Sequence, residues 1–295
     1  MKILLCGPLP PPIGGVSIHL ERLSKHLESV GNQVLVLNEA KSINPSATLN
    51  LRHKLSISKL LKAYYTSDVV HIHSSLLIFR FFHIFMSTVF GKKYIITIHS
   101  HRSKNKLLLA MERLFYSRSK AVIAVNQSIN SKLKLSNCLV KNAFLPPSSY
   151  VPLPVEICEF VASKKRLGKT VGVSNAFRII EFDNEDLYGL DLCIEATKML
   201  DRCLAFVFVI SDGGNRERIE SAKAELQKLN IDFLLWEGPI DFPSLISLAD
   251  FSVRATNTDG DALSIREAIH LNKTIIASDV VPRPNGTVLF KNRKS

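Results

Sequence analysis

The stretch Thr256-Asn-Thr-Asp-Gly-Asp-Ala-Leu-Ser-Ile-Arg-Glu-Ala-Ile269 decides how the fold is interpreted. It lies between two short apolar runs, 251–255 and 274–278, which have the length and the β-branched residues of strands. Its own apolar residues recur at helical spacing. The order strand, loop, helix, strand predicts a βαβ unit of a parallel sheet. Asp259 then lies in the loop at the carboxyl end of a strand, where open α/β sheets bind ligands.

Two carboxylates of this stretch are candidates for ligand binding. Asp259 precedes the predicted helix, and Glu267 follows it by eight residues, within the helix. The rise of a helix would place the two carboxylates on the order of 10 Å apart. Such a pair suits hydroxyl groups at the two ends of a long ligand, such as a nucleotide-sugar. The alternative is a surface loop followed by a solvated helix face.

The segment from Asp259 to Ala268, followed by Lys273-Thr-Ile-Ile-Ala-Ser-Asp279, resembles the donor-sugar motif of retaining, GT-B-fold glycosyltransferases of family 4, the group 1 glycosyltransferases. The resemblance implies that Glu267 holds the ribose of the donor. It also implies that Asp259, which stands where the family has a glutamate, holds sugar hydroxyls. The further donor-binding residues that we expect are Arg254, Thr258, Gly260, Asp261, Ala262 and Leu263.

A second motif follows the first predicted strand, 2–6. The loop 7–15 is rich in glycine and proline, and the apolar spacing after it predicts a helix. Free N–H groups at the start of a helix stabilise an anion such as a phosphate, although a structural tight turn would leave the same pattern. In the resembled family a Gly-Gly loop approaches the donor diphosphate, and Gly14 and Gly15 match it.

Two His-x-His pairs end predicted strands, namely His71 with His73 and His99 with His101. Residues i and i+2 of a strand share a face, so a metal site is one interpretation. Because acidic residues are scarce around both pairs, we expect instead histidines that line a crevice, and no metal and no cofactor. The segment from Thr97 to Ser100 matches a sugar-contacting segment of the family. We therefore group His99 with Asp259 and Glu267 as catalytic candidates, and expect structural roles for His71 and His73.

The length of 295 residues suits two domains. A proline-rich connector, 145–154, divides the chain, and we place the domains at 1–150 and 151–295. Strands and helices alternate in both parts, which predicts an α/β protein. With the resemblance, the expected fold is GT-B: two Rossmann-like, doubly wound parallel-sheet domains facing a cleft, with the donor in the second.

The first 150 residues contain 20 Lys and Arg against 5 Asp and Glu, a net charge of +15. This charge indicates an anionic partner. The apolar run 76–90 predicts either a buried helix or a helix that inserts phenylalanines into a lipid surface. We expect this domain to face an anionic membrane and a glycolipid or oligosaccharide acceptor. Without a basic helix or a ladder of aromatic residues, nucleic acid is not an expected partner.

The five cysteines are scattered, which favours a reducing compartment, and no signal peptide or spanning segment is evident. We expect a cytoplasmic enzyme, peripheral on the inner face of the cell membrane.

Two departures from the family pattern favour a competing hypothesis. The family carries an Arg and a Lys before the predicted helix at 190, where this chain has Asp183 and Tyr188. The cations that we consider as substitutes are Arg178, Arg254 and Arg266. The chain also ends earlier than is usual in the family. The main hypothesis is sugar transfer with retention in cell-surface glycan synthesis. The alternative is a catalytically impaired GT-B remnant that acts as a membrane-associated scaffold.

Overall fold

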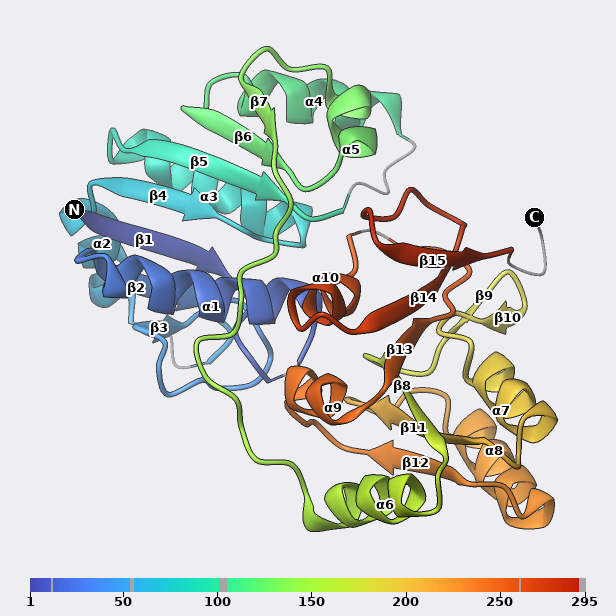
Figure 1. The fold of residues 1–295 in the computed structure, drawn as a ribbon. Helices are drawn as coiled ribbons and strands as arrows, with labels where there is room; N and C mark the ends of the chain where they lie inside the picture. The colour runs from blue at the N-terminus through green and yellow to red at the C-terminus, as the bar shows by residue number, and fades with distance from the viewer. Residues whose placement is uncertain (12, 54–55, 101–104, 260, 292–295) are drawn as a thin grey trace. The chain divides into compact units, whose positions relative to one another are not determined.

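The computed structural model describes residues 1–11, 13–53, 56–100, 105–259 and 261–291. The chain forms two compact units, Met1–Leu145 and Pro146–Ser295 (Figure 1). The division falls at the start of the proline-rich segment.

The described part of the first unit contains a seven-stranded parallel sheet with the order β3-β2-β1-β4-β5-β6-β7. Its strands are β1 Lys2–Gly7, β2 Gln33–Asn38, β3 Leu49–Asn50, β4 Val69–Ile72, β5 Lys93–Ile98, β6 Ala121–Ala124 and β7 Cys138–Val140. Its helices are α1 Gly15–Ser29, α2 Ile57–Thr66, α3 Leu77–Val89, α4 Lys106–Tyr116 and α5 Gln127–Leu133.

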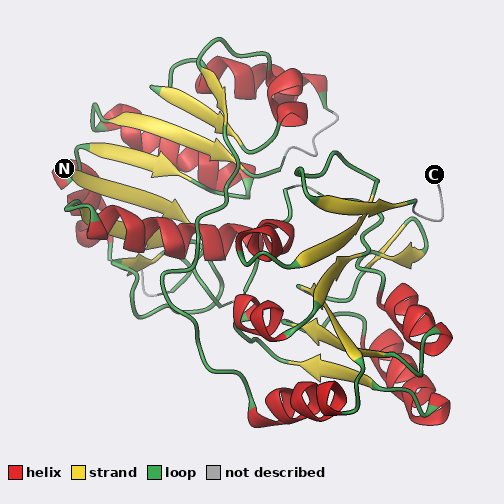
Figure 2. Cartoon of the chain, viewed as in Figure 1, coloured by secondary structure: helices red, strands yellow, loops and turns green. Residues whose placement is uncertain are grey.

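The first sheet is covered by helices on both faces (Figure 2). Leu4, Leu5 and Cys6 of β1 are fully buried, the continuous burial expected of a central parallel strand. On one face Leu20 of α1 packs with Leu5, and on the other α2 to α5 contribute to a larger core. The strand order reverses between β1 and β4, so the loops that follow these strands lie at a topological switch point, where such folds bind ligands.

The described part of the second unit contains a six-stranded parallel sheet with the order β12-β11-β8-β13-β14-β15 and a short antiparallel hairpin, β9-β10. Its strands are β8 Thr170–Ala176, β9 Glu181–Phe182, β10 Glu185–Asp186, β11 Leu204–Ile210, β12 Phe233–Glu237, β13 Phe251–Arg254, β14 Thr274–Ser278 and β15 Thr287–Phe290. Its helices are α6 Val155–Arg166, α7 Leu190–Met199, α8 Arg216–Leu229, α9 Phe242–Leu248 and α10 Leu263–His270.

The predicted strand, loop, helix and strand over 251–278 are present as β13, α10 and β14. Both sheets are parallel and both units alternate strands with helices, so the prediction of an α/β fold with two doubly wound sheets is confirmed. The first strand of this sheet, β8, ends at Ala176, and the chain then turns into the hairpin β9-β10.

Gly189 fixes the packing of α7 against the end of β13. Its φ is +70°, and a Cβ at this position would stand 2.5 Å from the carbonyl oxygen of Ala255. Only glycine combines this backbone conformation with such a close approach. The start of α7 is therefore held directly against the loop that follows β13.

Among the described residues, no helix combines the length and the apolar character that crossing a membrane requires.

Candidate functional site

The switch point of the second sheet lies between β8 and β13, and the loop after β13 carries Asp259. The carboxylate of Asp259 is held by two arginines. Arg254 donates from Nε to Oδ2 at 3.0 Å, and Arg283 donates from Nη1 to the same oxygen at 2.9 Å. The hydroxyl of Thr256 lies 3.2 Å from this oxygen. We call Arg254, Thr256, Asp259 and Arg283 the aspartate clamp.

The clamp keeps Asp259 ionised. Burial by itself would raise the pKa of this carboxyl group, but the positive charges and hydrogen bonds of Arg254 and Arg283 outweigh burial and lower the pKa to about 2. The group therefore remains an acceptor-only carboxylate throughout the physiological pH range.

Sequence analysis did not identify Arg283. Its side chain is only 2% exposed, and it also donates to the carbonyl oxygen of Ser278 at 2.9 Å and lies 3.1 Å from the hydroxyl of Thr256. It thus connects the loops that follow β13 and β14. The sequence could have pointed to Arg283 through its neighbours Pro282 and Pro284. These prolines fix the backbone on both sides of an arginine that lies close to a strand end.

The three arginines considered as substitutes for the family's cations all have carboxylate partners within the second unit. Arg254 pairs with Asp259, Arg266 donates to Asp261 at 2.7 Å, and Arg178 forms an ion pair with Asp212. Tyr188, which stands where the family has a cation, lies with its ring 5.0 Å from the guanidinium carbon of Arg254. The Tyr188 ring therefore stabilises the positive charge of Arg254 by a cation–π contact, whereas the family has a positively charged residue at this position.

The other predicted donor-binding residues lie on the loop after β13 and at the start of α10. Glu267 is 5% exposed, on the buried side of α10. Ala262 is the residue before α10, Leu263 begins the helix and Thr258 is half-buried. One oxygen of Asp261 bonds Arg266, and the other, Oδ2, is buried without a hydrogen-bond partner in the described structure. Gly260 lies outside the described residues.

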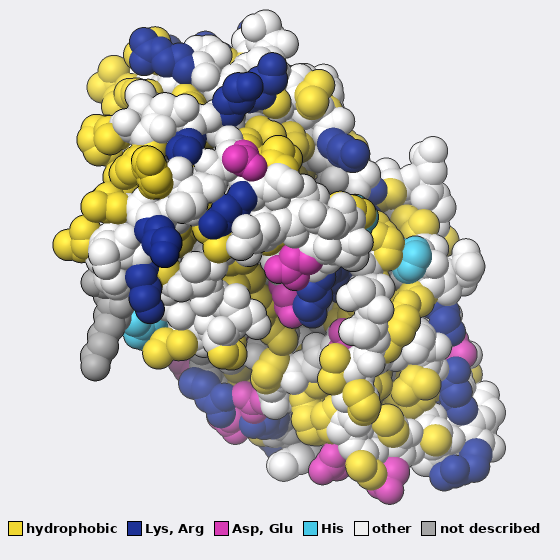
Figure 3. Space-filling view, turned by 90° about the vertical axis from the view of Figure 1, so that its left-hand side faces the viewer, with side chains coloured by type: hydrophobic (Ala, Val, Ile, Leu, Met, Phe, Trp, Pro, Cys, Tyr) yellow, Lys and Arg dark blue, Asp and Glu magenta, His cyan; other side chains and the backbone are white. Residues whose placement is uncertain are grey.

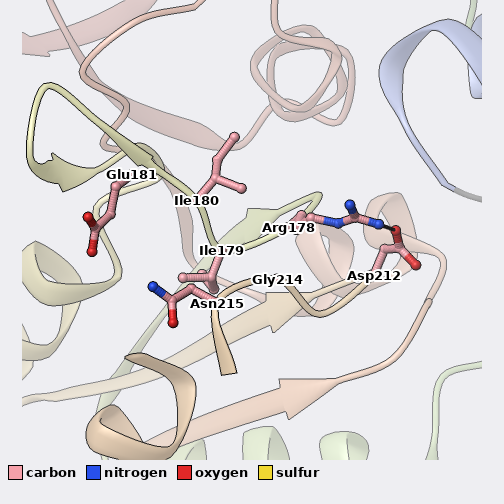
Figure 4. Close-up of a pocket in the computed structure, with 7 residues that line it drawn as sticks. All are labelled: Arg178, Ile179, Ile180, Glu181, Asp212, Gly214 and Asn215. Atoms are coloured by element: carbon pink, nitrogen blue, oxygen red, sulfur yellow. Dashed lines mark hydrogen bonds and ion pairs between the residues drawn. The ribbon is translucent and has the colours of Figure 1, made fainter. Parts of the chain in front are cut away.

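A pocket of about 540 Å³ opens beside this region, between the loops that follow β8 and β11 (Figure 4). Its volume is in the range of small-molecule sites. Figure 4 shows Arg178 pointing towards Asp212, while Glu181 and Asn215 carry polar groups from the hairpin and from the start of α8. The lining residues are Arg178, Ile179, Ile180, Glu181, Asp212, Gly214 and Asn215.

The histidines of the first unit form a cluster at its own switch point. The ring of His73, just after β4, lies 4.1 Å from that of His71, 5.5 Å from that of His99 and 5.1 Å from that of His19 in α1. Gly7, the last residue of β1, makes room for this arrangement, since a Cβ there would be 3.1 Å from that of His73.

Burial lowers the pKa of each of these four histidines, and the charges of neighbouring histidines lower the pKa further for His71, His73 and His99. The pKa of His71 falls to about 3. All four rings are therefore neutral at pH 7. His71 shares a hydrogen bond with the hydroxyl of Thr97 at 2.8 Å. His99 is half-buried and His73 wholly buried, while His101 lies outside the described residues.

The predicted phosphate-binding glycines lie at the start of α1. The N–H group of Gly14 donates to the hydroxyl of Ser17 at 2.9 Å, and Gly15 is the first residue of the helix. A Cβ built at Gly15 would meet nothing within 4 Å. This backbone is therefore open to a ligand on the side of Gly15.

The helix α3 combines features of both interpretations of the run 76–90. Arg80 and His83 are buried, whereas Ile78 and Phe85 are 75% and 63% exposed. The buried polar groups have partners: Arg80 donates to the hydroxyl of Tyr116 at 2.7 Å, and Nε2 of His83 lies 3.0 Å from Glu39. The helix thus packs its polar residues inward and exposes apolar ones.

Comparison with known proteins gives one family model that matches part of the first unit and solved structures that share the fold. Residues 13–136 match the model of Glycosyltransferase Family 4. No curated protein matches the sequence. Over 99% of this chain and 86% of the other, the structure is similar to HepE (Alr3699) of Anabaena in complex with UDP-glucose, with a TM-score of 0.71 and 14% identity.

Two further solved structures are similar over 99% of this chain. A glycosyltransferase of Rickettsia africae is 17% identical over 84% of its length, with a TM-score of 0.70. Sucrose-phosphate synthase of Thermosynechococcus elongatus is 13% identical over 86% of its length, with a TM-score of 0.64. The chain therefore adopts the GT-B fold, and its residues 13–136 are similar to glycosyltransferase family 4.

Proposed function

We propose that this protein is a retaining hexosyltransferase that moves a sugar from a nucleoside-diphosphate-sugar to a lipid-linked or polysaccharide acceptor in cell-surface glycan synthesis. The observation that carries the proposal is the aspartate clamp, which holds an ionised Asp259 at the carboxyl edge of the second sheet, eight residues before the buried Glu267. The structural similarity to HepE in complex with UDP-glucose supports the same class of donor.

In this proposal the second unit binds the donor. Glu267 accepts hydrogen bonds from the ribose and Asp259 from the sugar hydroxyls, while Gly14 and Gly15 of the first unit contact the diphosphate. The clamp combines two guanidinium groups with one carboxylate, a net charge of +1. This charge favours an anionic donor although the family's Arg and Lys are replaced by Asp183 and Tyr188.

The chemistry needs orientation and charge stabilisation more than a dedicated protein base. In the resembled family the leaving diphosphate is thought to help deprotonate the acceptor. Residues that fix the donor, such as Glu267, then contribute by holding the sugar in a reactive geometry. Fixed positive charge such as that of Arg254 and Arg283 stabilises the negative charge that develops on the diphosphate.

The exposed surface of the first unit suits an anionic membrane on the inner face of the cell, where a lipid-linked acceptor would be available. Of the five acidic residues among the first 150, Glu39 and Glu112 are buried, so the surface is more basic than the sequence count suggests. Basic residues near anionic lipid contribute about 1 kcal/mol each. Figure 3 shows apolar side chains interleaved with Lys and Arg on the displayed face. Exposed apolar residues of α2, α3 and α4 are Ile57, Leu61, Tyr65, Ile78, Phe85, Val89, Leu107, Met111 and Leu114.

A thermal-shift titration with UDP, GDP and their sugar conjugates tests the donor site. A ligand at 100 times its dissociation constant adds about 2.7 kcal/mol to the free energy of unfolding, which raises the melting temperature measurably. We expect a shift with one nucleotide and its sugar conjugate. If none of them changes the melting temperature, the proposal of a functional donor site is wrong.

A second function, that of a membrane-associated scaffold without activity, is favoured by one observation. Arg178, Arg254 and Arg266 are all paired with carboxylates of the protein itself. Vesicle binding that persists without any nucleotide-dependent shift would support this function.

A further inference from the structure

Three histidines from separate segments of the first unit bring their ring nitrogens together. His19 comes from α1, His73 follows β4 and His99 follows β5, and one nitrogen from each lies within 4.8 Å of the others. They gather at the switch point of the first sheet, the position at which such folds bind ligands. The cluster therefore lies where this type of sheet binds ligands, and its residues are of a type that binds metal ions.

The spacing of His73 and His99 fits a shared metal ion. Nδ1 of His73 lies 3.2 Å from Nε2 of His99. Two nitrogens that bind one tetrahedral zinc ion at about 2.0–2.1 Å lie roughly 3.3–3.4 Å from each other. The two rings are thus already at the separation that a common zinc ion requires, although the same distance also permits one hydrogen bond between them.

His19 is oriented like a zinc ligand. Its Nδ1–H donates to the carbonyl oxygen of Ala143 at 2.6 Å, which fixes the tautomer and leaves the lone pair on Nε2. Zinc-bound histidines usually donate their second nitrogen to a backbone carbonyl or a carboxylate in this way. The backbone of Ala143 therefore supplies the outer hydrogen bond of a metal site.

A metal ion also needs a route to these ligands. His99 is half-buried, which leaves one side open for entry and for a water molecule as a fourth ligand.

We propose that His19, His73 and His99 bind one Zn²⁺ ion in the first unit. Imidazole nitrogens suit zinc and its neighbouring transition metals, whereas Ca²⁺ and Mg²⁺ prefer oxygen ligands. The proposal rests on the geometry of the first unit alone and not on the aspartate clamp of the second unit. It reverses the expectation of no metal, which considered each His-x-His pair on its own strand and did not include His19 of the helix.

Isothermal titration of tag-free, chelator-treated protein with Zn²⁺ tests the proposal. We expect one equivalent to bind. Replacing a ligand, as in His19→Gln or His99→Ala, should weaken binding more than the roughly 10–100-fold that loss of an outer partner costs. The matched control is His26→Ala, which removes an exposed histidine from the same helix and should bind as the unchanged protein does.

Co²⁺ provides a second measurement, since its visible absorption reports nitrogen ligation in a four- or five-coordinate site. The spectrum should appear with one equivalent, disappear in His99→Ala and persist in His71→Gln, because His71 bonds Thr97 instead. Thermal unfolding in chelator shows whether each variant is folded. His99→Ala should disturb folding least, because His99 is only half-buried. A protein that fails to bind one equivalent, or ligand variants that bind Zn²⁺ as tightly as His26→Ala, would overturn the proposal. Nucleotide titrations in chelator examine donor binding separately.

Discussion

Arg283 donates from Nη1 to Oδ2 of Asp259 at 2.9 Å, although the two residues stand 24 positions apart in the chain. Their side chains are 2% and 9% exposed, so water screens this ion pair only weakly. The ion pair joins the loop after β14 to the loop after β13. The position of Asp259, the predicted sugar-binding residue, is thereby fixed by both loops.

Replacing Arg283 by Met should destabilise the second unit. Removing one partner of a buried ion pair leaves the other charge uncompensated, at a cost of about 3–5 kcal/mol, of which Arg254 offsets a part here. Urea unfolding of Arg283→Met, Asp259→Asn and the double variant measures the coupling. The double variant should lose less than the sum of the single losses, and simple additivity would show that the two side chains do not interact.

The clamp also predicts how stability depends on pH. The pKa of Asp259 is lowered from 3.8 to about 2 in the folded protein. A lowered carboxyl pKa contributes stability above pH 3.8 and loses it as the pH falls through 3.8 towards 2. The contribution is about 2 kcal/mol. The difference in unfolding free energy between the unchanged protein and Asp259→Asn should therefore shrink between about pH 5 and about pH 3. A difference that stays constant would show that this carboxyl group has an ordinary pKa.

Replacing Glu267 by Ala should abolish sugar transfer, and Glu267→Gln should weaken donor binding because an amide accepts ribose hydroxyl bonds less strongly than a carboxylate does. The thermal-shift titration and an assay of UDP release measure both effects. The matched control is Glu225→Gln on α8, an exposed position that should leave both unchanged. An active Glu267→Ala protein with unaltered donor binding would contradict the assignment.

Membrane binding should depend on the exposed face of α3. We expect Ile78→Glu with Phe85→Glu to reduce co-sedimentation with anionic vesicles, because both apolar contact and attraction to the lipid are lost. Met199→Glu, which changes a 79% exposed residue of α7, is the control. Binding should weaken as salt is added, since salt screens exposed charges. Equal binding by the α3 variant and the control would place the membrane contact elsewhere.

The βαβ unit around Asp259 could be predicted because its evidence is local. Apolar periodicity and two short β-branched runs define β13, α10 and β14 within fewer than thirty residues. The partners of Asp259 could not be predicted in this way. The contact between Arg283 and Asp259 depends on the pairing of β14 with β13, which local sequence patterns do not specify. The spacing of carboxylates was visible in the sequence, but the arginines that neutralise them depend on tertiary structure.

The same limit applies to α3. The run 76–90 is apolar nearly all round, and its two interruptions, Arg80 and His83, would ordinarily mark a solvent-facing side. The structure turns them inward, since Glu39 and Glu112 from distant segments provide buried partners. His19 was missed for a similar reason, because a helix brings it to two strand ends that the sequence pairs considered separately.

Gly189 touches no predicted ligand, yet it determines how closely α7 and the strand that bears Arg254 can approach. Any side chain there would have to displace Ala255, the residue between Arg254 and Thr256, both of which hold Asp259. The close contact between α7 and the loop after β13 thus depends on the absence of a side chain at Gly189. Even a methyl group at position 189 would therefore displace the backbone that carries the aspartate clamp, without touching any of the four clamp residues directly.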